Sequence, residues 1–474
     1  MVININELIL EMKPYYLLLF AGNCLPVFSG TIENNKETPN VIFILADDLG
    51  IGDLGCYGQD RIKTPAIDYL ANNGMKFTQH YSGSTVSAPS RCSLLTGKHT
   101  GHSYIRGNKG YIGKDNRKYD LNLADEEITL GEIFKIKDYT TACIGKWGLG
   151  GPSGEGHPNN QGFDYFFGYL GQANAHNYYP DQLFENNNPI ILDNKVYSHD
   201  LIIEKALNFL NKNYDKPFFL YLTPTIPHQH LIVPENEFYD YDGKFDEPAT
   251  KGKKYRKGSK PRTTFASMVT RLDYGVQSII NLLKEKNILD NTIIIFTSDN
   301  GTHEEGGHNP KYFDSNGPFR GIKRDLYEGG IRTPFIIHWP AVIKPGSISF
   351  HESTFWDFMP TVCDLINVEK PKNIDGISYL PTVLGYGKQK KHDYLYFEFH
   401  ERGGKQAVIK DRWKLIRLNV NKPDEEVYEL YNLNADPSEI ANVYSLYPAI
   451  VKDLKNIMNK SHIRNENWLF SYEK

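Results

Sequence analysis

Four apolar runs, each about as long as a β-strand, constrain the fold of this chain more than any other feature. They show no alternation of apolar and polar residues, which is typical of strands buried on both faces of a parallel sheet. Helical patterns lie between the runs, so the predicted fold class is α/β. The runs span residues 41–46, 139–144, 217–222 and 291–296.

Polar side chains follow each run, either directly or within a few residues. In an open α/β sheet, ligands bind at the carboxyl ends of the strands, so these side chains predict one shared site. Each of them alone also fits a helix cap, a surface lysine or a tight turn, and only their coincidence favours a site. In chain order they are Asp47, Asp48, Lys146, His228, Asp299 and Asn300.

Oxygen ligands dominate this set. Asp47, Asp48, Asp299 and Asn300 offer three carboxylates and one amide. Such donors suit a hard divalent cation, and we expect Ca²⁺, which would act as a Lewis acid toward the anionic oxygens of a substrate. The sequence has no histidine cluster with zinc-ligand spacing, and its five cysteines are scattered.

Residues 84–97 read S-T-V-S-A-P-S-R-C-S-L-L-T-G. Pro89 fixes φ and lacks an N–H, so it suits the first turn of a helix. Ser87 is then expected just before that helix, facing free N–H groups and the positive end of the helix dipole, where an anion binds well. Arg91, one turn further on, can point at the same anion. An isolated Ser-x-Pro would be explained by an ordinary helix cap.

The whole string resembles the sulfatase signature Cys/Ser-x-Pro-Ser-Arg-x-x-x-Leu-Thr-Gly. The chain is therefore similar to the formylglycine-dependent (type I) sulfatases of the serine type. The resemblance extends from about residue 40 to the C-terminal helix. It implies an alkaline-phosphatase-like fold, with a large mixed sheet sandwiched by helices and a smaller C-terminal α+β subdomain. The matched positions are Ser87, Pro89, Ser90, Arg91, Leu95, Thr96 and Gly97.

The resemblance also implies roles for single residues. Ser87 would be oxidised to formylglycine (3-oxoalanine) by a serine-type sulfatase-maturating enzyme, and the hydrated aldehyde would attack sulfur. Arg91 and Lys146 match residues that hold this hydrate and the sulfate. Lys323 matches the lysine that bridges the sulfate and the ester oxygen, and His228 matches the histidine near the leaving oxygen, a general-acid candidate. Asp47, Asp48, Asp299 and Asn300 match the calcium ligands.

One position departs from the family pattern. Many sulfatases have Gly-Lys-Trp-His where this chain has Gly148 in the fourth place. That histidine normally contacts the hydrated aldehyde. His176 and His102 are the candidates to replace it, and we place His176 among the catalytic residues.

Several loop strings resemble bacterial carbohydrate sulfatases close to N-acetylgalactosamine-6-sulfatases and arylsulfatases. The implied substrate is a sulfated carbohydrate, and we expect a 6-O-sulfate on galactose or N-acetylgalactosamine. About half of the substrate-binding candidates should prove structural, because many polar loop residues serve only their loop. A basic stretch at 251–262 fits a solvated loop better than a contact with a sulfated polymer. The substrate-binding candidates are His102, Arg106, Asn108, His230, His303 and His400.

Composition and the N-terminus limit location and partners. With 53 Lys and Arg against 57 Asp and Glu, the chain gives no global sign of a nucleic-acid or membrane-surface partner. Residues 1–30 are interpreted as a signal peptide behind a mis-annotated start, and the apolar run at 15–21 is too short to span a bilayer. We therefore expect a periplasmic, secreted or cell-surface bacterial protein without a transmembrane segment after signal removal. The expected domains are 31–392, catalytic, and 393–474, a small antiparallel sheet with a terminal helix.

Two alternatives stay open at this stage. A metal-dependent phosphatase or phosphodiesterase of the same superfamily would need a two-metal site with several histidine ligands. It would leave the Pro-Ser-Arg of the signature unexplained. If Ser87 is never oxidised, the chain would instead be a non-catalytic protein that binds sulfated glycans.

Overall fold

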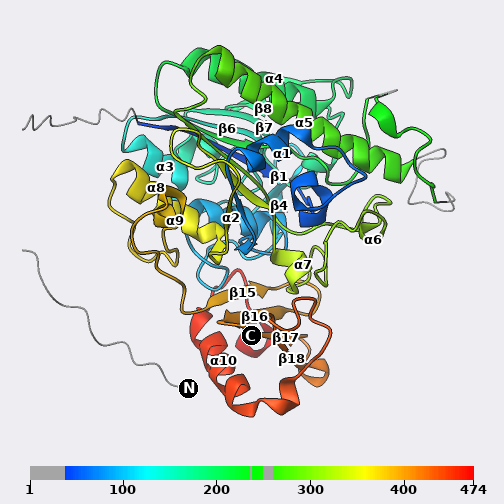
Figure 1. Ribbon diagram of the computed structural model, residues 1–474, viewed down its shortest axis with the longest axis vertical. Helices are drawn as coiled ribbons and strands as arrows, with labels where there is room; N and C mark the ends of the chain where they lie inside the picture. The colour runs from blue at the N-terminus through cyan, green and yellow to red at the C-terminus, as the bar shows by residue number, and fades with distance from the viewer. Residues whose placement is uncertain (1–37, 235–236, 249–259) are drawn as a thin grey trace, which may run out of the picture. The chain divides into compact units, whose positions relative to one another are not determined.

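The computed structural model describes residues 38–234, 237–248 and 260–474. A large mixed sheet runs through it (Figure 1). The sheet has ten strands in the order β13-β2-β12-β11-β1-β10-β6-β7-β8-β9. Its strands are β1 (Asn40–Ala46), β2 (Met75–Phe77), β6 (Thr140–Lys146), β7 (Tyr165–Tyr169), β8 (Gln182–Glu185), β9 (Asn188–Ile191), β10 (Phe218–Thr223), β11 (Thr292–Ser298), β12 (Phe335–His338) and β13 (Ser347–Ser349).

The four apolar runs form the parallel centre of this sheet, as predicted. β1 pairs in parallel with β10 on one side and β11 on the other, with Ile44 beside Leu222 and Phe296. β6 continues the parallel order on the far side of β10. The carboxyl ends of these strands therefore share one edge. Residues 150–171 are rich in glycine and aromatic residues, which predicts an Ω-type loop over the site. That prediction is wrong for part of the segment, because β7 lies within it and extends the sheet.

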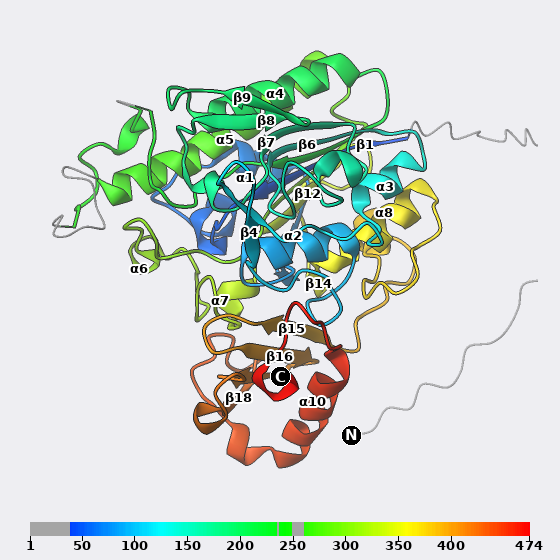
Figure 2. The same ribbon diagram turned by 180° about the vertical axis from the view of Figure 1, so that it is seen from behind.

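Helices cover both faces of the sheet (Figures 1 and 2). Side chains alternate along β1: Ile42 and Ile44 join one apolar cluster and Val41, Phe43 and Leu45 join the other. Both faces are thus buried, which explains the unbroken apolar runs. The first cluster is closed by α1 (Pro65–Asn72), α4 (Ser198–Asn213) and α5 (Pro261–Glu285), and the second by α2 (Ser87–Thr96), α3 (Leu130–Lys135) and α8 (Phe358–Ile366).

The C-terminal part is a four-stranded antiparallel sheet followed by a helix, as expected. The strands run in sequence order, and Val408 and Leu415 pack with Leu454 of the helix. Residues 38–474 form one compact unit, so the boundary between residues 392 and 393 stays a prediction, and the signal segment 1–30 lies outside the described residues. These elements are β15 (Leu395–Phe399), β16 (Lys405–Lys410), β17 (Trp413–Leu418), β18 (Val427–Asn432) and α10 (Pro448–Ser461).

Short elements complete the part of the chain that the structure describes. They are β3 (His80–Tyr81), β4 (Gly110–Ile112), β5 (Lys118–Asp120), α6 (Pro310–Phe313), α7 (Glu328–Ile331), β14 (Ser353–Thr354) and α9 (Leu380–Leu384). The basic stretch expected at 251–262 falls mostly outside the described residues. Among the described helices, none is both long and apolar enough to cross a bilayer.

Candidate active site

Ser87 is the first residue of α2, and the extended Val86 takes the N-cap position. This corrects the expectation that Ser87 precedes the helix. Pro89 lies in the first turn, where its missing N–H costs nothing. The first hydrogen bond of the helix runs from the N–H of Ser90 to the carbonyl of Val86, so the N–H groups before it stay free of helix bonds. The Ser87 side chain is buried at the positive end of α2.

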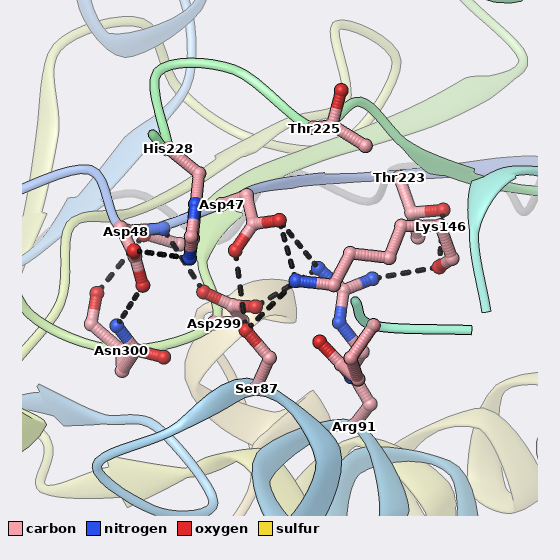
Figure 3. Close-up of polar contacts among 12 residues, drawn as sticks. Asp47, Asp48, Ser87, Arg91, Lys146, Thr223, Thr225, His228, Asp299 and Asn300 are labelled. Carbon is pink, nitrogen blue, oxygen red and sulfur yellow. Dashed lines mark hydrogen bonds and ion pairs between the residues drawn. The ribbon is translucent and has the colours of Figure 1, made fainter. Parts of the chain in front are cut away.

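The Ser87 hydroxyl lies between a carboxylate and an ammonium group (Figure 3). It donates to Asp47 Oδ1 at 3.1 Å, and Lys146 Nζ lies 3.2 Å from the same hydroxyl oxygen. Lys146 Nζ also donates to Asp47 Oδ2 at 2.6 Å. Asp47 follows β1 and Lys146 ends β6, so the sheet edge and the start of α2 bring together residues that are 40 and 59 positions from Ser87.

Arg91 is fully buried behind Ser87 and is fixed at two points. Its Nη2 donates to Asp299 Oδ2 at 2.9 Å, and its Nη1 donates to the carbonyl of Lys146 at 2.9 Å. Arg91 Nη2 lies 4.0 Å from Asp47 Oδ2. The guanidinium therefore neutralises carboxylates from β1 and β11 and holds Lys146 in place, while its one fixed orientation directs positive charge toward Ser87.

The four predicted metal ligands gather at the ends of β1 and β11. Asp48 N donates to Asp299 Oδ1 at 3.1 Å, and Asn300 Nδ2 donates to Asp48 Oδ1 at 2.7 Å. The buried Asn300 Oδ1 has no hydrogen-bond partner within residues 38–234, 237–248 and 260–474. Burial, and then the charge of Asp47, raise the pKa of Asp299 to about 6. Crowded carboxylates beside an unpaired amide oxygen fit a divalent cation.

His228 and Lys323 lie beside Asp48, one of the predicted metal ligands. Lys323 Nζ lies 2.8 Å from Asp48 Oδ2 and 2.8 Å from His228 Nε2. An ammonium group can only donate, so His228 Nε2 accepts and its Nδ1–H donates to the carbonyl of Gln229 at 2.8 Å. Burial, reinforced by Lys323, lowers the pKa of His228 well below its ordinary value. The resting imidazole is therefore neutral.

A cavity of about 140 Å³ opens onto these groups. Five predicted residues line it: Ser87, Asn108, His176, His228 and Lys323. Five other residues that line the cavity were not predicted from the sequence. Of these, Arg324 could have been suspected, because it follows Lys323 in the chain. The missed residues are Lys118, Asp120, Gln172, Ala173 and Arg324.

His176 stacks on His228, with ring centroids 4.4 Å apart. Burial, and then the charges of Lys146 and Lys323, lower the pKa of His176 to about 3. It is thus a second neutral imidazole in the cavity wall. His230 lies at the exposed side of this pair, with its Nδ1 2.9 Å from the carbonyl of His176.

Other substrate-binding candidates lie away from the cavity. Arg106 Nη1 donates to the buried Glu398 Oε1 at 2.9 Å, and His400 Nε2 lies 2.8 Å from the same oxygen. These two residues therefore join the catalytic part to β15, contrary to the expectation that they face the substrate. His102 pairs with Asp375 at 2.8 Å. His303 is fully buried, with its Nε2 3.2 Å from a backbone carbonyl.

Comparison with known proteins identifies the family of this site. Residues 39–368 match the Sulfatase family, and residues 319–464 match the family described as N-sulphoglucosamine sulphohydrolase, C-terminal. The chain is 29% identical to an N-acetylgalactosamine-6-O-sulfatase of Bacteroides thetaiotaomicron, over 91% of this chain and 94% of that protein. It is 28% identical to an N-acetylglucosamine-6-O-sulfatase of the same bacterium, over 96% of this chain and 91% of that protein.

A solved structure agrees with this assignment. The crystal structure of Ps i-CgsB in complex with k-i-k-neocarrahexaose matches with a TM-score of 0.76 and 29% identity, over 92% of this chain and 94% of that chain. The predicted alkaline-phosphatase-like fold and the resemblance to sulfatases are thereby confirmed. The chain belongs to the sulfatase family and is a sulfuric ester hydrolase.

Proposed function

We propose that this enzyme hydrolyses a sulfate ester on a carbohydrate, a 6-O-sulfate on galactose or N-acetylgalactosamine, through a formylglycine made from Ser87. The observation that most directly supports this proposal is the position of the Ser87 hydroxyl, which lies between Asp47 Oδ1 and Lys146 Nζ at the wall of the cavity. The relatives named for 6-O-sulfatase activity on amino sugars support the substrate class.

The surroundings of Ser87 fit the modification that the family implies. When formed, the hydrated aldehyde supplies the nucleophile and lets sulfate leave again. Asp47 Oδ1 accepts the proton of an oxygen at this position, while Lys146 Nζ donates to that oxygen and fixes its direction. The two groups thus orient one oxygen toward the cavity and hold its proton.

Positive charge around the cavity stabilises the sulfate. Lys323 lines the cavity, Lys146 lies behind Ser87 at 3.2 Å from its hydroxyl oxygen, and buried Arg91 adds further positive charge. Asp47, Asp48, Asp299 and Asn300 would hold the divalent cation, for which we propose Ca²⁺, since all four offer oxygen ligands. Calcium, when bound, supplies Lewis acidity toward the sulfate oxygens.

The leaving sugar oxygen needs a proton. Lys323 Nζ and His228 Nε2 share one across 2.8 Å, and both residues line the cavity. We assign this pair the general-acid role: Lys323 carries the shared proton at rest, and its transfer to His228 Nε2 would make His228 the acid that protonates the leaving oxygen. His176, stacked on His228, keeps the ring in position.

The same proposal covers maturation and location. A serine-type sulfatase-maturating enzyme would oxidise Ser87, and the N-terminal residues would direct export to the periplasm or cell surface. Export brings the enzyme to polymeric sulfated glycans, which are outside the cell.

Sulfate release tests the proposed activity. The protein is co-expressed with a serine-type maturase and offered monosulfated galactose, N-acetylgalactosamine and N-acetylglucosamine, with Ser87→Ala as the control. Release from a 6-O-sulfated sugar that is abolished in the control is expected. Release of phosphate from phosphate esters instead would favour the phosphatase alternative. Binding of the sugars without any release from oxidised protein would favour a non-catalytic glycan-binding role.

A further inference from the structure

The side chain of Gln172 takes up the space beside Gly148. A Cβ built on Gly148 would lie 2.1 Å from Gln172 Nε2 and 2.8 Å from its Cδ, far closer than non-bonded atoms approach. Gly148 also has a φ of +76°, which favours glycine over any residue with a side chain. The Gly148 N–H donates to the carbonyl of Leu170 at 2.9 Å, which fixes it next to the segment that carries Gln172.

Asp120 fixes the backbone of Gln172, whereas the side-chain nitrogen of Gln172 makes no hydrogen bond to the described residues. Its backbone N–H donates to Asp120 Oδ2 at 2.7 Å. Its Nε2 is buried and has no hydrogen-bond partner in the part of the chain that the structure describes, although the residue lines the cavity. A buried N–H without an acceptor is unfavourable, so a ligand oxygen that accepts from it gains affinity.

His176 does not take this place. Its ring stacks on His228, whereas Gln172 is the residue that fills the space beside Gly148. His176 lines the same cavity as Ser87, so the expectation that it takes over the role of the missing histidine stays a prediction.

We propose that Gln172 donates a hydrogen bond to an oxygen of the bound sulfated sugar, from the position that a side chain at residue 148 would otherwise occupy. The identity of the ligand rests on the proposed function. An amide donates without titrating, so Gln172 holds an oxygen but takes no part in proton transfer. Gly148 and Gln172 then act as a pair, in which the glycine makes room for the donor.

Binding to the unoxidised protein tests this role without turnover. Protein expressed without a maturase retains Ser87 and is titrated with inorganic sulfate and with N-acetylgalactosamine-6-sulfate by calorimetry. Gln172→Met fills the same space without a donor and should weaken binding about 5- to 20-fold. Gln172→Glu keeps the shape, adds a negative charge and should weaken it further. Gln277→Met, on α5 outside the cavity, is the matched control.

The pattern of loss identifies the acceptor. Equal weakening for both ligands indicates a sulfate oxygen, and weakening for the sugar alone indicates a hydroxyl or ester oxygen of the sugar. Wild-type affinity and wild-type kcat/KM in a folded Gln172→Met protein would overturn the proposal. Wild-type protein that binds neither ligand would overturn it too. Failure of the proposed function looks different: oxidised wild type would then release sulfate from no sugar, whatever residue 172 is.

Discussion

The Ser87 hydroxyl donates to Asp47 Oδ1 at 3.1 Å, so the residue for which we propose oxidation is in direct contact with a predicted metal ligand. The contact joins the start of α2 to the end of β1. It means that any cation held by Asp47 lies close to the oxygen that would react. The proposed modification site and the proposed metal site are thus one arrangement, built on one edge of the sheet.

Metal removal should destabilise the protein and abolish its activity together. Without a cation, the carboxylates of Asp47, Asp48 and Asp299 repel one another, and burial of Asp299 keeps its pKa at about 6. We expect a chelator to lower the Tm by several degrees and added Ca²⁺ to restore it, in thermal melts of the purified protein. An unchanged Tm after chelation, with no calcium found by elemental analysis, would contradict the metal assignment.

Lys323 should matter far more for catalysis than for folding. Its ammonium group contacts both Asp48 and His228 and lines the cavity. Lys323→Met should lower kcat/KM about 10²- to 10³-fold, because a preorganised charge next to the sulfate is lost. Lys284→Met on the outer side of α5 serves as the control and should keep wild-type kinetics. A loss below about threefold in Lys323→Met would argue against the assigned role.

Lys414 should anchor the C-terminal sheet to the catalytic part. Its fully buried Nζ lies 2.9 Å from Glu328 Oε1 and 2.9 Å from Glu439 Oε1. Lys414→Met removes the ammonium group that these two buried carboxylates share, leaving Glu328 with Arg332 at 3.0 Å, and should cost about 3–5 kcal/mol in denaturant unfolding. Lys410→Met removes a solvent-exposed pair with Asp453, which water screens, and should lower the stability far less. Equal effects of the two substitutions would contradict the anchoring role.

Asp120 should make substrate binding weaken as the pH rises. Burial raises the pKa of this carboxyl to about 7, against the opposing charges of Lys146 and Lys118. Below that pH the group is neutral, and above it the carboxylate repels a sulfate in the same cavity. The other ionisable groups that line the cavity are Lys118, His176, His228, Lys323 and Arg324.

Kinetics of Asp120→Asn isolate this contribution. In wild type, kcat/KM should fall roughly three- to tenfold more than in Asp120→Asn between about pH 6 and about pH 8, because only wild type gains the charge. Parallel pH profiles for the two proteins would show that Asp120 stays in one protonation state across this range.

Gly148 and Gln172 should be coupled in stability. Gly148→Ala places a Cβ against the Gln172 amide and also strains the positive φ, so it should destabilise the protein by about 1–3 kcal/mol. Gln172→Ala removes the clash but not the strain, so the double variant should recover part of the loss. A double-mutant cycle in denaturant measures this coupling, and strictly additive effects would rule out the steric contact.

The centre of the fold could be predicted because its cause is local. Uninterrupted apolar runs such as residues 41–46 indicate strands that are buried on both faces of the sheet. Asp47 and Asp299 follow two such strands, so they were expected to meet at the same edge of the sheet. The start of α2 was predicted one residue late, since Pro89 marks a first turn without fixing which residue precedes it. The strand β7 was missed because glycines and aromatic residues around it indicated a loop.

The cavity wall could not be predicted to the same degree. Asp120 and Gln172 meet through a hydrogen bond between segments 52 residues apart, and neither carries a local signal of its position. Arg106 and His400 were misplaced for a related reason. A polar residue in a loop serves equally well as a ligand for substrate or as a partner for a buried carboxylate, and only the position of Glu398 decides which.

The most direct test compares the oxidised fraction of Ser87 with the rate of sulfate release. Protein co-expressed with graded amounts of a serine-type maturase is digested with trypsin, and the mass of the peptide 77–91 gives the oxidised fraction of Ser87. The account predicts that sulfate release from the 6-O-sulfated sugar rises in proportion to the fraction of peptide lacking two hydrogens and is abolished in Ser87→Ala. Sulfate release that is independent of this fraction, or that persists in Ser87→Ala, would contradict it.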